Sequence, residues 1–295
     1  MNKKIVSNLL LLLVAFIWGT AFVAQSKGTN HVGAFTFNAL RSILGGISLL
    51  PIIIVMNKKN DNTNSKETNS SSPIKGGIIC GIFLFAGSTF QQMGIAHTTA
   101  GKAGFITALY IVIVPLLGLF VGKRVKPLIW VCVAAAMAGF YLLCVNEDFS
   151  ISKGDILVLI CAFSFSLHII VIDYFNSKGT DGVKMSCIQF FTAAALSLIF
   201  MIIFENPTFE NILGAKTAIF YAGVMSSGVG YTLQIVAQKN ADPSAATLLL
   251  SMESVFAALA GWVLLNETLS GKEFAGCLLV FTAVIAAQFL TNKET

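Results

Sequence analysis

The sequence predicts an all-α integral membrane protein with ten transmembrane helices arranged as two inverted five-helix repeats. Three observations lead to this fold class: the composition, a series of long apolar stretches, and a loose internal similarity between the two halves. Of the 295 residues, 56% are hydrophobic and only 11% are charged, whereas a soluble domain carries about 25% charged residues. This composition excludes a water-soluble enzyme, a disordered chain and a secreted disulfide-stapled domain.

A helix needs roughly 20 apolar residues to cross about 30 Å of hydrocarbon. Ten stretches of this kind follow one another along the chain. We predict spans at 5–25, 32–56, 75–96, 102–121, 127–145, 155–176, 184–204, 217–238, 245–265 and 272–291. The first is interpreted as a span rather than a signal peptide, because its apolar run continues to Val23 without a small-residue cleavage site. The polar segment 57–74 is predicted to be a flexible cytoplasmic linker.

The distribution of basic residues predicts the orientation, because loops rich in Lys and Arg stay on the cytoplasmic side. With the N-terminus inside, the inner segments hold 13 Lys and Arg residues and the outer ones hold 5, while Arg41 lies within a span. Both termini are therefore predicted to face the cytoplasm of a multi-pass plasma-membrane protein. The short basic loops serve orientation, so no nucleic-acid partner is expected.

The two halves align loosely with each other at an offset near 144–148 residues. Phe105–Tyr110 falls on Leu249–Ser254, and Gly122–Val125 falls on Asn266–Leu269. We therefore divide the chain into repeats at 1–145 and 154–295. An odd number of spans in each repeat inverts the second relative to the first, and inverted repeats are typical of secondary transporters with a substrate site near the midplane.

Three segments carry a family resemblance. Ala100–Val125 resembles the fourth-helix motif of the drug/metabolite transporter superfamily, Ala245–Leu269 resembles its counterpart in the second half, and Leu12–Gln25 is similar to the superfamily's first helix. Together with the ten spans, they make the chain most similar to the EamA-type transporters. This resemblance implies export of amino acids and related metabolites, and a central cavity lined mainly by helices 1, 3, 4, 6, 8 and 9.

Four ionisable residues within spans are candidates for function, because a charge at the bilayer centre costs about 3 kcal/mol or more: Arg41, Asp173, His168 and Glu253. Asp173 lies near the cytoplasmic end of its span, where its carboxylate can reach water. Arg41 lies nine residues into the second span and Glu253 eight residues into the ninth, at depths of about 13 and about 12 Å from opposite faces. The two side chains are therefore able to pair. The functional reading makes Glu253 a proton-coupling or amine-binding carboxylate and Arg41 a clamp for a substrate carboxylate. The structural alternative is a charge pair that fixes two helices.

Other polar and aromatic residues fall on the helices that the resemblance places around the cavity. The predicted substrate-binding residues are Trp18, Gln91, Gln92, Tyr110, His168, Tyr231 and Gln234. Gln91 and Gln92 are about 100° apart around a helix, so we expect only one of them to face the cavity. His168 is also a candidate for ion coupling, because imidazole titrates near neutral pH; alternatively, it bonds one neighbour and packs. Pro115 is predicted to interrupt its span and allow a gating kink.

The leading functional prediction is a secondary transporter of small metabolites that works by alternating access, with proton coupling through Glu253 as a hypothesis. A facilitator, an exchanger, a drug efflux carrier and a channel remain alternatives. A membrane-embedded enzyme is a distant one, since H-E-x-x-H and G-x-S-x-G are absent from the sequence. The six cysteines show no C-x-x-C spacing, and no metal or cofactor is expected. The expected partners are a small-molecule substrate, membrane lipid and a possible second copy of the chain.

Overall fold

A computed structural model describes residues 3–61, 72–98, 100–120, 122, 127–144, 152–241, 243–265 and 270–292. Every regular element within these ranges is a helix, which confirms the all-helical prediction. The helices of the first half are α1 (Lys3–Thr29), α2 (Ala34–Asp61), α3 (Pro73–Ile95), α4 (Ala100–Thr107), α5 (Tyr110–Phe120) and α6 (Pro127–Cys144). Those of the second half are α7 (Lys153–Ser177), α8 (Gly182–Phe204), α9 (Phe209–Gly214), α10 (Lys216–Phe220), η1 (Tyr221–Tyr231), α11 (Thr232–Gln238), α12 (Pro243–Leu250), α13 (Met252–Leu265) and α14 (Gly271–Asn292).

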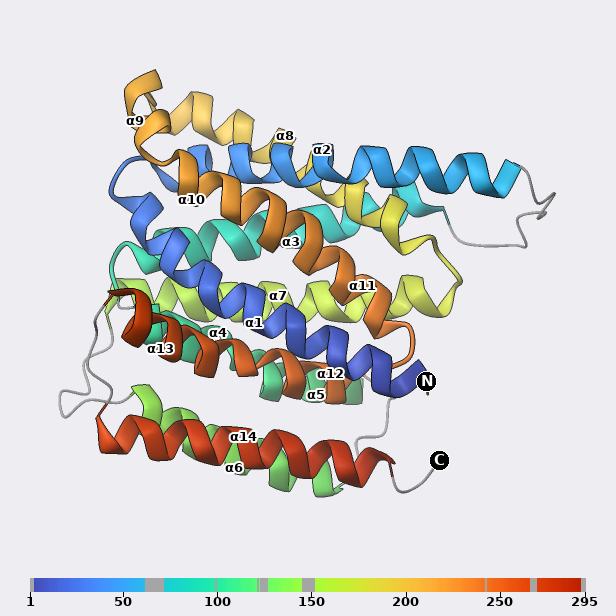
Figure 1. The fold of residues 1–295 in the computed structure, drawn as a ribbon, viewed down its shortest axis with the longest axis vertical. Helices are drawn as coiled ribbons and strands as arrows, with labels where there is room; N and C mark the ends of the chain where they lie inside the picture. The colour runs from blue at the N-terminus through green and yellow to red at the C-terminus, as the bar shows by residue number, and fades with distance from the viewer. Residues whose placement is uncertain are drawn as a thin grey trace.

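Eight segments within the described ranges are long and apolar enough to cross a membrane. They are Lys3–Thr29, Ala34–Lys58, Pro73–Ile95, Ala103–Phe120, Lys153–Ser177, Gly182–Phe204, Lys216–Gln238 and Pro243–Leu264. The helices α6 and α14 contain shorter apolar stretches, Pro127–Gly139 and Phe274–Ala286. The long helices lie side by side and run between two ends of the molecule, and α1 begins at the end where α14 finishes (Figure 1). The chain is therefore a multi-pass integral membrane protein.

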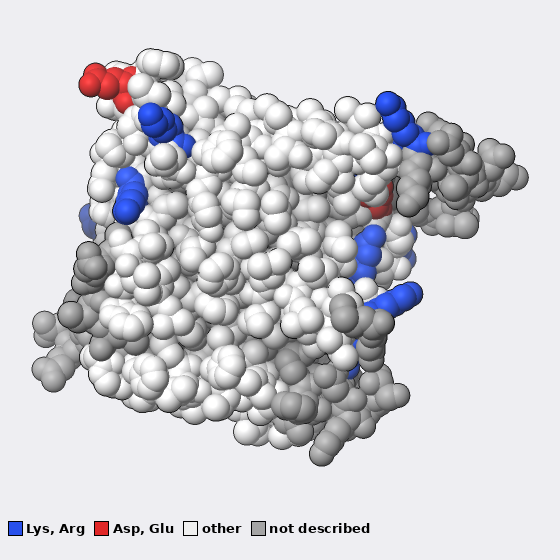
Figure 2. All heavy atoms as spheres, in the orientation of Figure 1, with Lys and Arg blue, Asp and Glu red and all other residues white. Residues whose placement is uncertain are grey.

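The surface agrees with a membrane location. Charged side chains gather at the two ends of the molecule, and the face between them is free of Lys, Arg, Asp and Glu in this view (Figure 2). The linker predicted at 57–74 is shorter than expected, because α2 continues to Asp61 and α3 already begins at Pro73. Residues 62–71 lie outside the described ranges.

Three predicted spans are not continuous α-helices. The fourth span breaks between α4 and α5. There the Leu109 N–H donates to the Ile106 carbonyl and the Ile111 N–H to the Ala108 carbonyl, each three residues back instead of the four of an α-helix. The ninth breaks between α12 and α13, where Ser254 N–H donates to Ser251 at 3.2 Å. The eighth contains η1, an 11-residue π-helix. Long π-helical segments are rare and often mark functional sites.

Pro115 lies buried inside α5, and the break in this span falls before it, at Ala108–Leu109. The gating kink at Pro115 stays a prediction. The two breaks fall within the segments that align between the halves, Phe105–Tyr110 and Leu249–Ser254. Breaks at matching positions are typical of transporter helices that line a substrate site.

Helices from the two halves pack against one another. The main pairs are α1 with α13, α2 with α8, α3 with α7 and α8, and α6 with α14. In addition, α1 and α2 pack against η1, while α4 and α5 pack against α7. Gly19 permits the close contact between α1 and α13, because a Cβ atom there would lie 2.5 Å from Phe256 Cβ and 2.7 Å from the Glu253 carbonyl oxygen.

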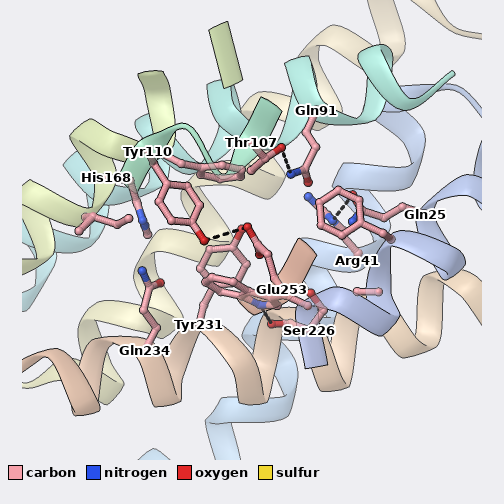
Figure 3. Close-up of a pocket in the computed structure, with 15 residues that line it drawn as sticks. Gln25, Arg41, Gln91, Thr107, Tyr110, His168, Ser226, Tyr231, Gln234 and Glu253 are labelled. Atoms are coloured by element: carbon pink, nitrogen blue, oxygen red, sulfur yellow. Dashed lines mark hydrogen bonds between the residues drawn. The ribbon is translucent and has the colours of Figure 1, made fainter. Parts of the chain in front are cut away.

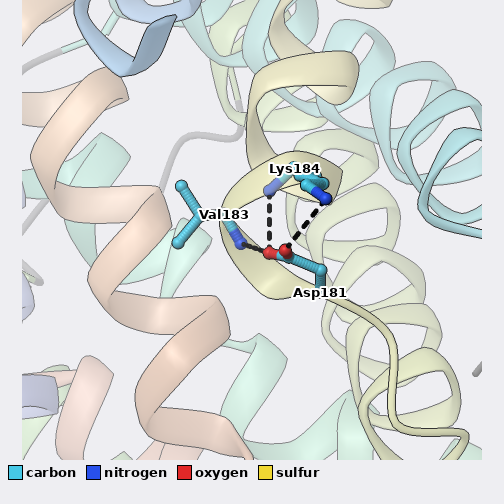
Figure 4. Close-up of polar contacts among 3 residues, drawn as sticks. All are labelled: Asp181, Val183 and Lys184. Carbon is cyan, nitrogen blue, oxygen red and sulfur yellow. Dashed lines mark hydrogen bonds and ion pairs between the residues drawn. The ribbon is translucent and has the colours of Figure 1, made fainter. Parts of the chain in front are cut away.

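Side-chain caps hold the helix ends. Asp181 accepts hydrogen bonds from the Val183 and Lys184 N–H groups at the start of α8, at 3.0 and 3.1 Å (Figure 4). At the far end of the same helix, the Glu205 carboxylate accepts from Phe35 N–H at 2.9 Å and from Thr36 N–H at 2.8 Å. Glu205, at the end of α8, therefore caps the start of α2, and this contact joins the two halves of the chain.

Candidate functional site

A narrow cavity of about 30 Å³ lies among helices of both halves. Its walls come from α1, α2, α3, the break between α4 and α5, α7, η1, α11 and α13. The lining residues are Trp18, Ala21, Phe22, Gln25, Arg41, Gln91, Thr107, Tyr110, Phe165, His168, Ile169, Ser226, Tyr231, Gln234 and Glu253 (Figure 3). Ligand pockets commonly enclose about 300–1,000 Å³, so this conformation has room for little more than water.

Glu253 is the carboxylate of the cavity. It lies in the first turn of α13, directly after the helix break, and is 3% exposed. The Tyr110 hydroxyl, at the start of α5, donates to Glu253 Oε1 at 2.9 Å, and the Ser254 hydroxyl donates to the Gly104 carbonyl at 2.8 Å. The partial positive charge at the start of a helix stabilises a carboxylate there. The two broken spans therefore contact each other near their breaks, once between two side chains and once between a side chain and a backbone carbonyl.

Arg41 is the cation of the cavity and is only 4% exposed. Its guanidinium donates to Gln25 Oε1 at 3.2 Å and lies 5.8 Å from the centre of the Phe37 ring. Both partners are neutral, although a guanidinium has five N–H donors. No ion pair joins Arg41 to Glu253 among the contacts of the described residues. The two charges thus line one cavity while each is held by its own neutral neighbour.

Aromatic rings form one wall. The Trp18 indole N–H donates to the Ser226 carbonyl of η1 at 3.2 Å, and the Trp18 and Tyr231 ring centres lie 4.6 Å apart. Gly230 makes room for this indole, because a Cβ atom there would lie 2.7 Å from Trp18 Nε1. The π-helix therefore presents both a carbonyl and an aromatic ring to Trp18.

His168 lies on α7 and is 1% exposed. Its Nε2 is 2.9 Å from Gln189 Oε1, and its ring meets the Tyr231 ring edge-on with centres 5.9 Å apart. His168 and Gln234 point toward each other at one end of the cavity. Arg41, Gln25 and Gln91 lie at the opposite end, with Glu253 and Tyr110 between the two groups (Figure 3).

The cavity brings together most of the residues that the sequence singled out. Those that line it are Trp18, Arg41, Gln91, Tyr110, His168, Tyr231, Gln234 and Glu253. Gln92 is absent from the lining; its amide donates to the Gln25 carbonyl at 3.2 Å, as expected for neighbours about 100° apart. Pro115 is also absent from it.

Sequence reasoning missed several lining residues, among them Gln25 and Thr107. Gln25 holds Arg41, and the Thr107 hydroxyl accepts from the Gln91 amide at 3.3 Å. Both are polar residues in apolar helices, the same signal that selected Gln91. The Ser226 carbonyl had no such signal, because a backbone acceptor becomes available only through the π-helical geometry.

A metal site is not apparent in the described part of the chain, which contains no group of three or more His, Cys, Asp or Glu residues placed to hold an ion. The thiols of Cys80, Cys132, Cys161 and Cys187 are buried and free there, and Cys277 is also buried. The side chain of Cys144 lies outside the described residues.

Comparison with known proteins gives a consistent assignment. Residues 5–145 and residues 152–287 each match the EamA-like transporter family. An "uncharacterized transporter" of Archaeoglobus fulgidus is 31% identical over 284 residues, covering 96% of this chain and 86% of that protein. The "uncharacterized inner membrane transporter YedA" of Escherichia coli K12 is 24% identical, covering 93% of this chain and 88% of that protein.

A protein of known crystal structure has the same fold. It superposes with a TM-score of 0.76 at 19% sequence identity, covering 98% of this chain and 99% of the other. At this identity the similarity concerns the fold alone.

Proposed function

The chain belongs to the EamA-like transporter family within the drug/metabolite transporter superfamily, and from this premise we propose that it exports amino acids or related metabolites by alternating access. The observation that carries the proposal is the arrangement of Arg41 and Glu253. Each charge lines the same cavity and is held by a neutral partner. An amino acid in its zwitterionic form offers one carboxylate for Arg41 and one ammonium group for Glu253.

The architecture we propose is ten transmembrane helices in two inverted five-helix repeats, 1–145 and 154–295. Helix packing supports it, because the main contacts between spans have counterparts when the two halves are exchanged. The first span packs on the eighth and ninth, and the sixth packs on the third and fourth. The helix breaks also fall at matching positions. We also propose that both termini lie in the cytoplasm, which the excess of Lys and Arg in the inner loops supports.

The coupling we propose is proton antiport through Glu253. Its contact with Tyr110 joins a broken span of the first half to one of the second. As a carboxylate, Glu253 accepts this hydrogen bond and attracts a substrate ammonium group. Once protonated, it loses its attraction for the cation, so substrate and proton compete for one site. Competition of this kind couples two opposite fluxes.

The test is uptake of a labelled amino-acid mixture into proteoliposomes, with and without an imposed pH gradient. Uptake accelerated by an acidic interior is the expected result, because protons leaving the vesicle drive substrate inward. Flux that does not depend on the pH gradient would contradict antiport and would indicate facilitated transport or exchange. A lack of flux for every amino acid would overturn the assignment of the substrate class.

A further inference from the structure

The hydrogen-bond network behind His168 determines which ring nitrogen carries the proton. Gln189 Oε1, 2.9 Å from His168 Nε2, is only an acceptor. The amide nitrogen of Gln189 points the other way and donates to the Ser186 hydroxyl at 3.5 Å. Ser186 in turn shares a 2.8 Å hydrogen bond with Thr232 on α11. His168 therefore carries its proton on Nε2 when it is neutral.

The other ring nitrogen of this tautomer is an acceptor. His168 Nδ1 has no hydrogen-bond partner among the described residues, and the ring lines the cavity. Gln234, which is 1% exposed, adds a carbonyl oxygen that is buried without a partner in the same part of the structure. Buried polar groups normally have hydrogen-bond partners, since leaving one unpaired destabilises the folded state. This end of the cavity therefore offers two acceptors to a ligand.

We propose that His168 and Gln234 form a side-chain subsite that selects substrates with an uncharged hydrogen-bond donor, a hydroxyl or a carboxamide. The proposal rests on the proposed function and narrows its substrate class to small polar amino acids. In this proposal Arg41 and Glu253 hold the substrate's backbone carboxylate and ammonium groups, and its side chain extends toward His168 and Gln234, which lie at the other end of the cavity from Arg41 (Figure 3). Charged side chains are disfavoured there, because both groups are neutral in this tautomer and burial penalises an unpaired charge.

Gln189 and Ser186 act as positioning residues for this subsite. Gln189 lies outside the lining of the cavity but holds the proton of His168 on the far nitrogen. Its replacement by leucine frees His168 to move its proton to Nδ1, which turns an acceptor into a donor.

The experiment is counterflow in proteoliposomes with two pairs of amino acids of similar shape, threonine against valine and asparagine against leucine. We expect kcat/KM for the polar member to exceed that of its apolar counterpart by about tenfold or more. Gln234→Leu, His168→Phe and Gln189→Leu should bring this ratio toward one. Gln91→Leu, at the opposite end of the cavity, should slow both members and leave the ratio unchanged.

A second readout is independent of transport. The ¹⁵N spectrum of the purified protein, with the His168 signal assigned by its loss in His168→Phe, should show the Nε2–H tautomer in the native chain and a shift in Gln189→Leu. Equal transport of threonine and valine, or an Nδ1–H tautomer in the native chain, would overturn the subsite and leave the amino-acid assignment standing. Absence of exchange for all amino acids would instead overturn the proposed function, and the subsite with it.

Discussion

Tyr110 and Glu253 are 143 residues apart in the chain, yet the tyrosine hydroxyl donates to the glutamate carboxylate at 2.9 Å. Each follows directly after a helix break, one between α4 and α5 and the other between α12 and α13. The contact therefore joins the two discontinuous spans at the level of the cavity. In transporters of this type, relative movement of the two halves exposes the site to each side in turn.

Tyr110→Phe is expected to reduce transport by about tenfold, because an unsatisfied buried carboxylate costs about 1–3 kcal/mol. The initial rate of amino-acid uptake into proteoliposomes measures this effect. Tyr174→Phe is the matched control, since that side chain is 56% exposed and its ring contacts survive the change. Equal rates for the native protein and Tyr110→Phe would remove the hydrogen bond from the mechanism.

Arg41→Gln separates a substrate clamp from a structural ion pair. Breaking a buried ion pair typically costs about 3–5 kcal/mol. Arg41 has only neutral partners among its described contacts. The unfolding temperature of Arg41→Gln should therefore equal or exceed that of the native protein, while uptake is lost. Arg41→Lys should retain uptake with KM raised by about tenfold, because an ammonium group cannot form the bidentate pair. A large fall in the unfolding temperature of Arg41→Gln would instead support the structural role.

Gly19→Ala should separate α1 from α13, because the added Cβ would lie 2.7 Å from the Glu253 carbonyl oxygen and 2.5 Å from Phe256 Cβ. Overpacking of this kind costs about 1–3 kcal/mol, and we expect both a lower unfolding temperature and slower uptake. Gly271→Ala is the control, since nothing lies within 4 Å of its Cβ position. An unfolding temperature and an uptake rate of Gly19→Ala equal to those of the native protein would contradict the close contact between α1 and α13.

Glu205→Ala tests the cap that joins α8 to α2. Removing the carboxylate leaves the Phe35 and Thr36 N–H groups without their acceptor, so the loss of stability should be about 1–2 kcal/mol. Thermal unfolding in detergent measures the change, and the exposed Glu210, replaced by alanine, serves as the control. The substrate preference should not change, because Glu205 is not among the residues that line the cavity. A change in preference would connect this cap with the substrate site.

The sequence predicted the helical fold and the main cavity residues because both depend on a strong signal. Long apolar runs identify spans, and buried charges such as Arg41 and Glu253 are costly enough to require a reason. The family resemblance supplied which helices surround the cavity, and the lining agrees with it at Trp18, Gln91 and Gln234. Helical geometry also predicted that Gln91 and Gln92 would face different ways.

Other features depend on tertiary contacts that leave little trace in composition. Pro115 attracted the prediction of a kink, while the break occurs at Ala108–Leu109, where no proline or glycine marks it. The π-helix over Tyr221–Tyr231 has an ordinary apolar sequence with glycines. Gln25 lies near the end of its helix, and only the fold reveals that it holds Arg41. The linker prediction followed polarity, although α2 continues through Lys58–Asp61.

The most direct test of proton coupling at this site is a comparison of two assays on Glu253→Gln, with Glu210→Gln as the control. Glutamine retains an acceptor for Tyr110 but cannot bind or release a proton near neutral pH. We predict that Glu253→Gln no longer responds to an acidic vesicle interior but still exchanges labelled for unlabelled amino acid. Gradient-driven uptake at the native rate in Glu253→Gln would contradict Glu253 as the coupling residue.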